Sequence, residues 1–119
     1  MILVDTSIWV DHFSLTEPRL LTLLRAGTIL GHPFVTGEIA CSSPPDRAKA
    51  IHFLGRLPQA VRALDADVMR MIDTKSLMGT GIGYLDAHLL ASTLLTRGAT
   101  FWTRDKRLAA AATRLGVAA

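Results

Sequence analysis

Four acidic residues of this chain are candidates for a shared chemical role, and several of them stand in apolar stretches where solubility does not require them. They are Asp5, Glu38, Asp86 and Asp105. A carboxylate that is buried without a partner costs several kcal/mol, so such a residue must be paired, protonated or bound to a cation. The helix predicted around Asp86 carries few basic residues that could pair with it. Because carboxylate oxygens are hard ligands, the pattern predicts a Mg²⁺ or Mn²⁺ site formed by the four side chains.

Each of these acids also has an ordinary structural explanation. Asp5 and Asp105 could cap the helices that follow them. Asp86 falls in the first turn of its predicted helix, where any acid gains from the helix dipole, and Glu38 could occupy a solvated helix edge. The four explanations are independent and would have to hold together. The joint pattern therefore favours a metal site.

Short apolar segments predict the strands that would position the acids. The predicted strands comprise residues 2–4, 28–30, 60–64 and 99–103. Asp5 and Asp105 each lie just past the carboxyl end of such a segment. Open parallel sheets bind their ligands outside that edge, so these two positions suit a functional site.

Capping residues and apolar periodicity predict helices between the strands. Helices are predicted directly after Asp5, over residues 18–27, 34–41 and 46–54, and after a cap at residues 65–67. The longest predicted helix spans residues 84–97, and the last runs from Asp105 through Leu115. The glycine-rich stretch 79–83 is interpreted as a hinge, because it follows a helix and lacks the later glycine and lysine of a phosphate loop. Alternating strands and helices imply a mainly parallel sheet with helices on both faces. With 119 residues, the chain is expected to form a single domain, 1–119.

Composition sets wider limits on function. The 13 Lys and Arg residues against 10 Asp and Glu give a net charge of +3, which permits a polyanionic partner without requiring one. The only cysteine, Cys41, excludes an internal disulfide and a cysteine-based zinc site, and is expected to be a small core residue. No apolar run approaches the ~20 residues of a membrane helix, and no signal peptide is recognised. We therefore expect a cytoplasmic protein with no membrane partner.

Four ordered motifs give the chain a family resemblance. They are residues 1–7 with Trp9 nearby, His32 and Pro33 leading to Glu38, residues 83–91 around Asp86, and residues 102–108 around Asp105. In this order and at these spacings, the whole chain resembles the PIN-domain ribonuclease toxins of the VapC type. The resemblance implies a PIN-like three-layer α/β/α sandwich with a short, mainly parallel central sheet. It also implies magnesium-dependent endonucleolytic cleavage of RNA, a homodimer, and a cognate antitoxin that inhibits the toxin.

The resemblance also implies roles for individual residues. The metal-binding catalytic carboxylates would be Asp5, Glu38, Asp86 and Asp105, supported by the hydroxyl groups of Thr6 or Ser7 and of Thr103. Mg²⁺, for which Mn²⁺ could substitute, would neutralise the scissile phosphate and activate a water for in-line attack, leaving 5′-phosphate and 3′-hydroxyl ends. Next to Asp105, the basic residues Arg104, Lys106 and Arg107 are candidate contacts for RNA phosphates, with a solvated helix start as the alternative.

Other functions fit the residues less well. A phosphatase of the haloacid-dehalogenase type needs a second Asp two residues after the first, and that position is Ser7. A response-regulator receiver needs an acidic pair after the first strand, which is absent. The serious alternative is a PIN fold that binds RNA or protein without cleaving. Four intact acids argue against it, since a binding protein gains nothing from crowding like charges.

Overall fold

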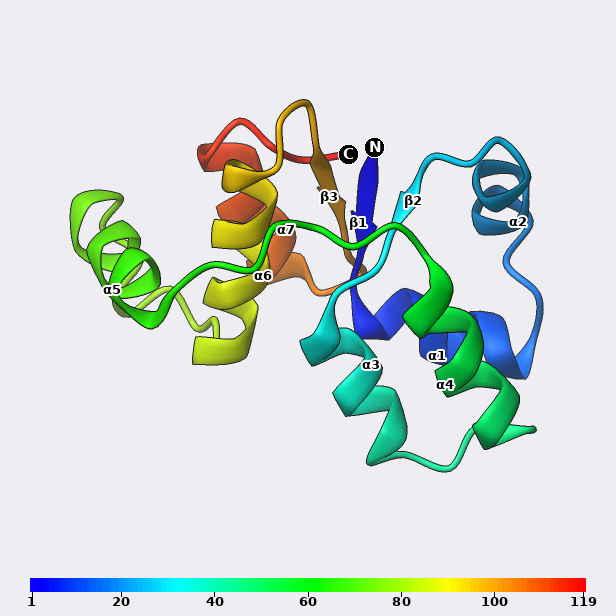
Figure 1. The fold of residues 1–119 in the computed structure, drawn as a ribbon. Helices are drawn as coiled ribbons and strands as arrows, with labels where there is room; N and C mark the ends of the chain where they lie inside the picture. The colour runs from blue at the N-terminus through cyan, green and yellow to red at the C-terminus, as the bar shows by residue number, and fades with distance from the viewer.

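The shortest elements of the protein form its centre. In the computed structural model, which describes residues 1–119, strand β1 (Ile2–Val4) lies between β2 (Ile29–Leu30) and β3 (Thr100–Trp102), and both neighbours are parallel to it (Figure 1). Ile2 pairs with Ile29 on one side and with Thr100 on the other. The run of apolar residues in β1 follows from this position, because a central parallel strand is covered on both faces.

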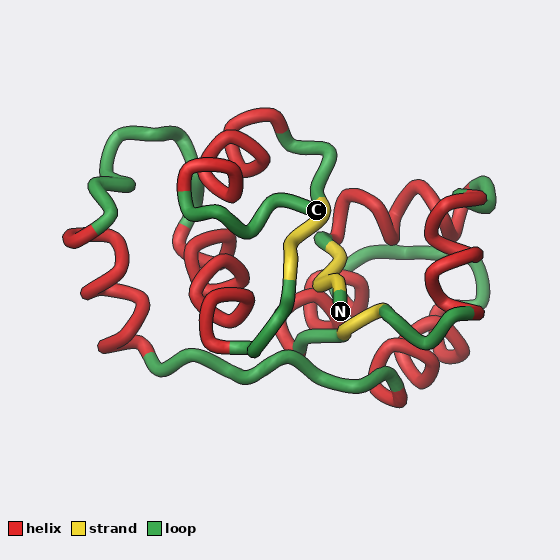
Figure 2. Tube along the Cα trace, turned by 90° about the horizontal axis from the view of Figure 1, so that it is seen from above, coloured by secondary structure: helices red, strands yellow, loops and turns green.

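Seven helices cover this sheet. They are α1 (Thr6–Ser14), α2 (Pro18–Arg25), α3 (Pro33–Ala40), α4 (Arg47–Arg56), α5 (Asp65–Thr74), α6 (Tyr84–Leu95) and α7 (Lys106–Arg114). Helices α1 to α4 lie on one side of the strands and α5 to α7 on the other (Figures 1 and 2). The predicted α/β/α sandwich with a short parallel sheet is therefore confirmed. None of the seven helices combines the length and apolar character that a membrane span needs.

The segment 60–64 is not a strand, contrary to the sequence prediction. Its backbone is extended but forms no ladder with β1, β2 or β3. Only the N–H of Ala60 donates to a neighbouring backbone, to the C=O of Gly31 at 2.9 Å. Further along, Val61 donates to Thr96 Oγ1 at the C-cap of α6 at 2.8 Å, and Ala63 donates to Ser92 Oγ in α6 at 3.4 Å. Side chains of α6 and its cap thus replace the partners that a continued ladder would supply.

Two helix boundaries also differ from the prediction. Asp65 does not cap α5 but is its first residue, and the N-cap position falls on Leu64, which makes no side-chain cap bond. The Asp65 carboxylate contacts α6 instead, where it accepts a hydrogen bond from Tyr84 Oη at 3.1 Å and lies 2.9 Å from His88 Nε2. Helix α6 ends at Leu95, short of the predicted residue 97, although it is still the longest helix.

Helix α6 forms a large part of the core. All residues from Ala87 to Thr93 are buried, because α6 packs against β3 on one side and α5 on another. This explains its apolar character around most of its circumference, which is typical of an enclosed helix. Asp86 directly precedes the enclosed stretch and is half-buried in the first turn of α6.

Candidate active site

The four acids predicted from the sequence gather around the carboxyl ends of the strands. Asp5 directly follows β1 and Asp105 follows β3, while Glu38 belongs to α3, which begins after β2, and Asp86 to the first turn of α6. The strands end at the lower edge of the sheet in Figure 1, where α1 and α3 start. Each of the two half-buried acids, Glu38 and Asp86, senses the charge of two others. The structure therefore brings all four into one electrostatic neighbourhood.

Asp5 is the most firmly held of the four. Its side chain is 7% exposed, and Oδ1 accepts a hydrogen bond from the N–H of Thr6 at 2.8 Å. Oδ2 accepts from the hydroxyl groups of Ser7 at 3.0 Å and Thr103 at 2.6 Å. Three donors satisfy a buried carboxylate and fix its orientation. Ser7 and Thr103, to which the family resemblance gave the role of supporting the carboxylates, both contact Asp5.

Glu38 faces Asp5 across the end of the sheet. Thr6 joins the two acids, because its N–H donates to Asp5 and its hydroxyl donates to Glu38 Oε1 at 3.0 Å. Burial raises the pKa of Glu38 above its ordinary value, the Thr6 hydrogen bond lowers it, and the charges of Asp5 and Asp86 raise it again. The net shift is upward, so negative charge is disfavoured at this position in the absence of a cation.

Asp86 both caps its helix and belongs to the acidic cluster. Its Oδ2 accepts a hydrogen bond from the N–H of Gly83 at 3.1 Å, which satisfies the N-cap backbone donor of α6. Burial is the main cause that raises the pKa of Asp86; the Gly83 bond opposes the shift, and the charges of Asp5 and Asp105 add to it. The structural and functional explanations for this residue are therefore compatible.

Asp105 likewise caps its helix and belongs to the acidic cluster. Its Oδ1 caps α7 by accepting from the N–H of Leu108 at 3.0 Å. Three carboxylate oxygens receive no hydrogen bond from the chain, namely Glu38 Oε2, Asp86 Oδ1 and Asp105 Oδ2. Free, hard oxygen atoms among crowded negative charges fit a divalent cation. The side chains do not form a ready coordination shell, however, since no three His, Cys, Asp or Glu groups converge closely enough to hold an ion.

The three basic residues around Asp105 differ in their surroundings. Arg104 forms two ion pairs: its Nε lies 2.9 Å from Asp11 Oδ2, and its Nη2 contacts the carboxylate of Glu17. Arg107 forms no ion pair with an acid, and its side chain lies against the backbone of Gly81, where a Cβ atom would come within 2.6 Å of Arg107 Cδ. Lys106 is exposed. The guanidinium of Arg107 is thus freer for an external anion than that of Arg104.

His32 is a supporting residue that the sequence pattern had marked only as part of a turn. It is fully buried, and its Nδ1 accepts from the N–H of Phe34 at 3.0 Å, which caps α3. Its Nε2 must then carry the proton and donate to Ser92 Oγ, 2.9 Å away on α6. Burial lowers the pKa of His32 to about 4, so the ring is neutral near pH 7. A histidine directly before a helix-starting proline was the available signal for this cap.

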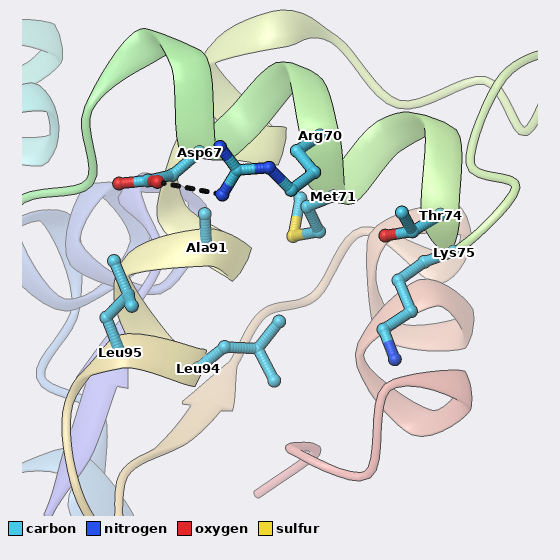
Figure 3. A pocket seen from close by; sticks show the side chains of 8 residues that line it. All are labelled: Asp67, Arg70, Met71, Thr74, Lys75, Ala91, Leu94 and Leu95. Atoms are coloured by element: carbon cyan, nitrogen blue, oxygen red, sulfur yellow. Dashed lines mark hydrogen bonds and ion pairs between the residues drawn. The ribbon is translucent and has the colours of Figure 1, made fainter.

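Two of the hollows that border α6 lie in very different settings. One, of about 450 Å³, includes Glu38 in its lining and so opens onto the acidic cluster. The other, of about 240 Å³, lies between α5 and the C-terminal half of α6, where Asp67 and Arg70 form an exposed ion pair and Leu94 and Leu95 form the floor (Figure 3). None of the four acids lines the second hollow, so only the first belongs to the candidate site.

Comparison with known proteins identifies the family of the chain. No family model matches the chain. Two relatives, each named Ribonuclease VapC32 and coming from two strains of Mycobacterium tuberculosis, are each 42% identical to it over 118 residues. The aligned region covers 99% of this chain and 95% of each relative. An identity of this size over almost the full length of both chains shows common descent, and the chain belongs to the VapC family of PIN-domain ribonuclease toxins.

Proposed function

We propose that the protein is the toxin of a toxin–antitoxin pair and an endoribonuclease that hydrolyses RNA phosphodiester bonds with the help of Mg²⁺, or of Mn²⁺ in its place. The observation that carries the proposal is the cluster of Asp5, Glu38, Asp86 and Asp105 at the carboxyl end of the parallel sheet. The full-length similarity to curated relatives named as ribonucleases supports the reaction class. Cytoplasmic RNA is the proposed substrate pool.

The metal would be held by the oxygen atoms that the chain leaves free on Glu38, Asp86 and Asp105, together with Asp5. When bound, a divalent cation supplies positive charge to the phosphate and makes a water more acidic. Thr6, Ser7 and Thr103 keep the carboxylates of Asp5 and Glu38 oriented before any ligand arrives. Such preorganisation matters because a misplaced charge would have to move during the reaction.

The raised pKa values of Glu38 and Asp86 support the presence of a cation in the working site. Burial and like charges make the ionised forms costly, and a cation would remove that cost. Arg107, seated on Gly81 beside the cluster, would hold a phosphate of the RNA strand as a sequence-independent contact. Lys106 could add to this contact, whereas Arg104 would first have to leave Asp11 and Glu17.

Cleavage of RNA with and without metal tests the proposal. Protein purified free of antitoxin is incubated with a mixed single-stranded RNA pool in Mg²⁺, in Mn²⁺ and in EDTA. We expect cleavage in both metals and none in EDTA, and products with 5′-phosphate ends. Asp5→Asn should abolish cleavage, whereas Asp73→Asn, which makes the same change on the exposed face of α5, should not. Equal cleavage in EDTA would exclude the metal mechanism.

The alternative function is a PIN-fold module that binds RNA or protein without cleaving. It predicts RNA retention on the protein with no turnover in any metal. If Asp5→Asn still binds RNA but no longer cleaves it, the wild-type protein is a nuclease rather than a binding module alone.

We further propose a cognate antitoxin and a homodimer, both expected from the family. An antitoxin segment that places an Arg among the four carboxylates would replace the charge of the metal, since a guanidinium pairs with carboxylates in a bidentate manner. Co-expression with the neighbouring reading frame should give a stable, inactive complex. Light scattering on the isolated toxin measures the dimer directly, and a monomer at working concentration would contradict it.

A further inference from the structure

A hollow of about 450 Å³ opens beside Glu38, at the side of the acidic cluster that faces α3 and the start of α6. It is lined by Pro33, Phe34, Gly37, Glu38, Cys41 and Leu85. Five of these residues belong to α3 or cap its end, and their spacing of three or four positions places them along one face of the helix. Cys41 is exposed on this face, so the prediction that it is a core residue is wrong.

Gly37 keeps the hollow open. A Cβ atom built at this position would meet no atom within 4 Å, which means that the space above the glycine is empty. Gly37 directly precedes Glu38 and lies four residues before Cys41. A larger side chain at residue 37 could therefore extend into the hollow without disturbing the packing of α3.

The walls of the hollow are mainly apolar and include one carboxylate, and a cation lies beside one of the walls. Phe34 and Leu85 provide apolar surface, and Glu38 connects the hollow to Asp5 and Asp86. The Arg62 guanidinium lies over the Phe34 ring, 5.3 Å from its centroid. An RNA strand carries matching groups, since each base projects from a ribose flanked by two phosphates and offers a flat face that stacks on apolar or aromatic surface.

We propose that this hollow is a subsite for one nucleobase of the RNA, next to the phosphate that the carboxylates and their metal would hold. The proposal rests on the ribonuclease function proposed above and adds the position of a base. Ligand pockets of roughly 300–1,000 Å³ hold small molecules, so the hollow accommodates a base with its ribose. The exposed Arg62 side chain, beside Phe34, would contact a neighbouring phosphate. Because most of the lining is apolar, the subsite contributes affinity more than base identity.

Filling the hollow tests the subsite through the Michaelis constant. Gly37→Leu is compared with Gly55→Leu, a matched control in α4 where a Cβ atom would also meet nothing within 4 Å and which does not line the hollow. We expect KM for single-stranded RNA to rise about tenfold in Gly37→Leu with kcat little changed, the order of effect for losing one base contact. Gly55→Leu should match the wild type. Equal KM values in all three proteins would overturn the subsite.

Cys41 offers a second measurement that does not depend on cleavage. It is the only cysteine and lines the hollow, so its alkylation by N-ethylmaleimide, followed by mass spectrometry, reports occupancy. An excess of short single-stranded RNA of randomised sequence, with Mg²⁺, should slow alkylation of the wild type at least several-fold. An abasic ribose-phosphate oligomer of the same length should protect much less.

The outcomes separate the subsite from the proposed function. Cleavage of RNA without protection of Cys41 would leave the ribonuclease function standing and overturn the subsite. Protection without cleavage would support the subsite and contradict the ribonuclease function. Protection of Cys41 by a co-purified protein partner, but not by RNA, would assign the hollow to that partner and also overturn the subsite.

Discussion

Replacing Gly37 by alanine is expected to stabilise the protein even though the residue borders the candidate active site. Glycine inside a helix is less favourable than alanine by roughly 0.5–1 kcal/mol, because the unfolded chain loses more freedom. No strain opposes this gain, since the new Cβ atom would meet nothing within 4 Å. For a chain of this size, 1 kcal/mol corresponds to roughly 4 °C in Tm, so we expect an increase of about 2–4 °C.

Gly81 should give the opposite result from the same substitution. Its φ of +87° lies in the region that favours glycine, and a Cβ atom would stand 2.6 Å from Arg107 Cδ. The backbone conformation alone costs an L-residue about 1–2 kcal/mol, and the Arg107 side chain must also move. We expect Gly81→Ala to melt roughly 4–8 °C below the wild type.

Melting curves in EDTA, with Gly55→Ala as a second helical control, measure these changes. Urea titrations should give the same order of stabilities with an unchanged m value, which excludes an effect on the compactness of the unfolded state. If Gly37→Ala has a Tm at or below that of the wild type while Gly55→Ala has a higher Tm, the space next to residue 37 is not empty. A Gly81→Ala protein as stable as the wild type would refute the assigned loop conformation.

Further predictions concern protonation and charge. In EDTA, wild-type stability relative to Asp86→Asn should improve as the pH falls from 7 towards the ordinary carboxyl value of 3.8, because a folded state with a raised pKa binds more protons than the unfolded chain. Parallel pH profiles of the two proteins would contradict the raised pKa of Asp86. His32 has the opposite effect on the pH dependence in both proteins, since its pKa falls from 6.5 to about 4 on folding and stability is lost as the pH drops through that range. NMR titration should show a neutral ring with the proton on Nε2 down to about pH 4. A charged ring at pH 6 would contradict the burial of His32. Saturating Mg²⁺ should raise the Tm of the wild type by mass action and that of Asp86→Asn much less, whereas equal gains would make Asp86 only a helix cap. Arg104→Gln should weaken RNA binding less than Arg107→Gln, and filter binding at several salt concentrations compares the two variants. The effect of Arg104→Gln on stability should be small and should shrink with added salt, because the ion pairs of Arg104 are exposed.

Local patterns were sufficient for much of the fold. The apolar segments at residues 2–4 and 28–30 contain all of β1 and β2, and the caps at Asp5 and Asp105 are present as predicted. Each of these features depends on residues that are neighbours in the sequence. The positions of Asp5 and Asp105 at strand ends could therefore be predicted without coordinates.

Other features depend on contacts between distant residues. The segment 60–64 has the composition of a strand, but the N–H groups of Val61 and Ala63 donate to side chains of the α6 cap and of α6. Arg104 has the position of a phosphate contact, yet it pairs with Glu17, 87 residues earlier. Cys41 is exposed because nothing packs on that face at the end of α3. No local pattern contains this information.

The hydrogen bond between Thr103 and Asp5 has a consequence for the synthesis of the protein. It joins residues 98 positions apart, and the pairing of β1 with β3 brings together the same two distant parts of the chain. Contacts of such large sequence separation form late, because the entropy of closing the loop must be overcome first. A nascent chain that has not yet exposed Thr103 and Asp105 cannot complete the acidic cluster. Incomplete products of translation should therefore be harmless to the cell that makes them, and the nuclease would become active only once nearly the whole chain has left the ribosome.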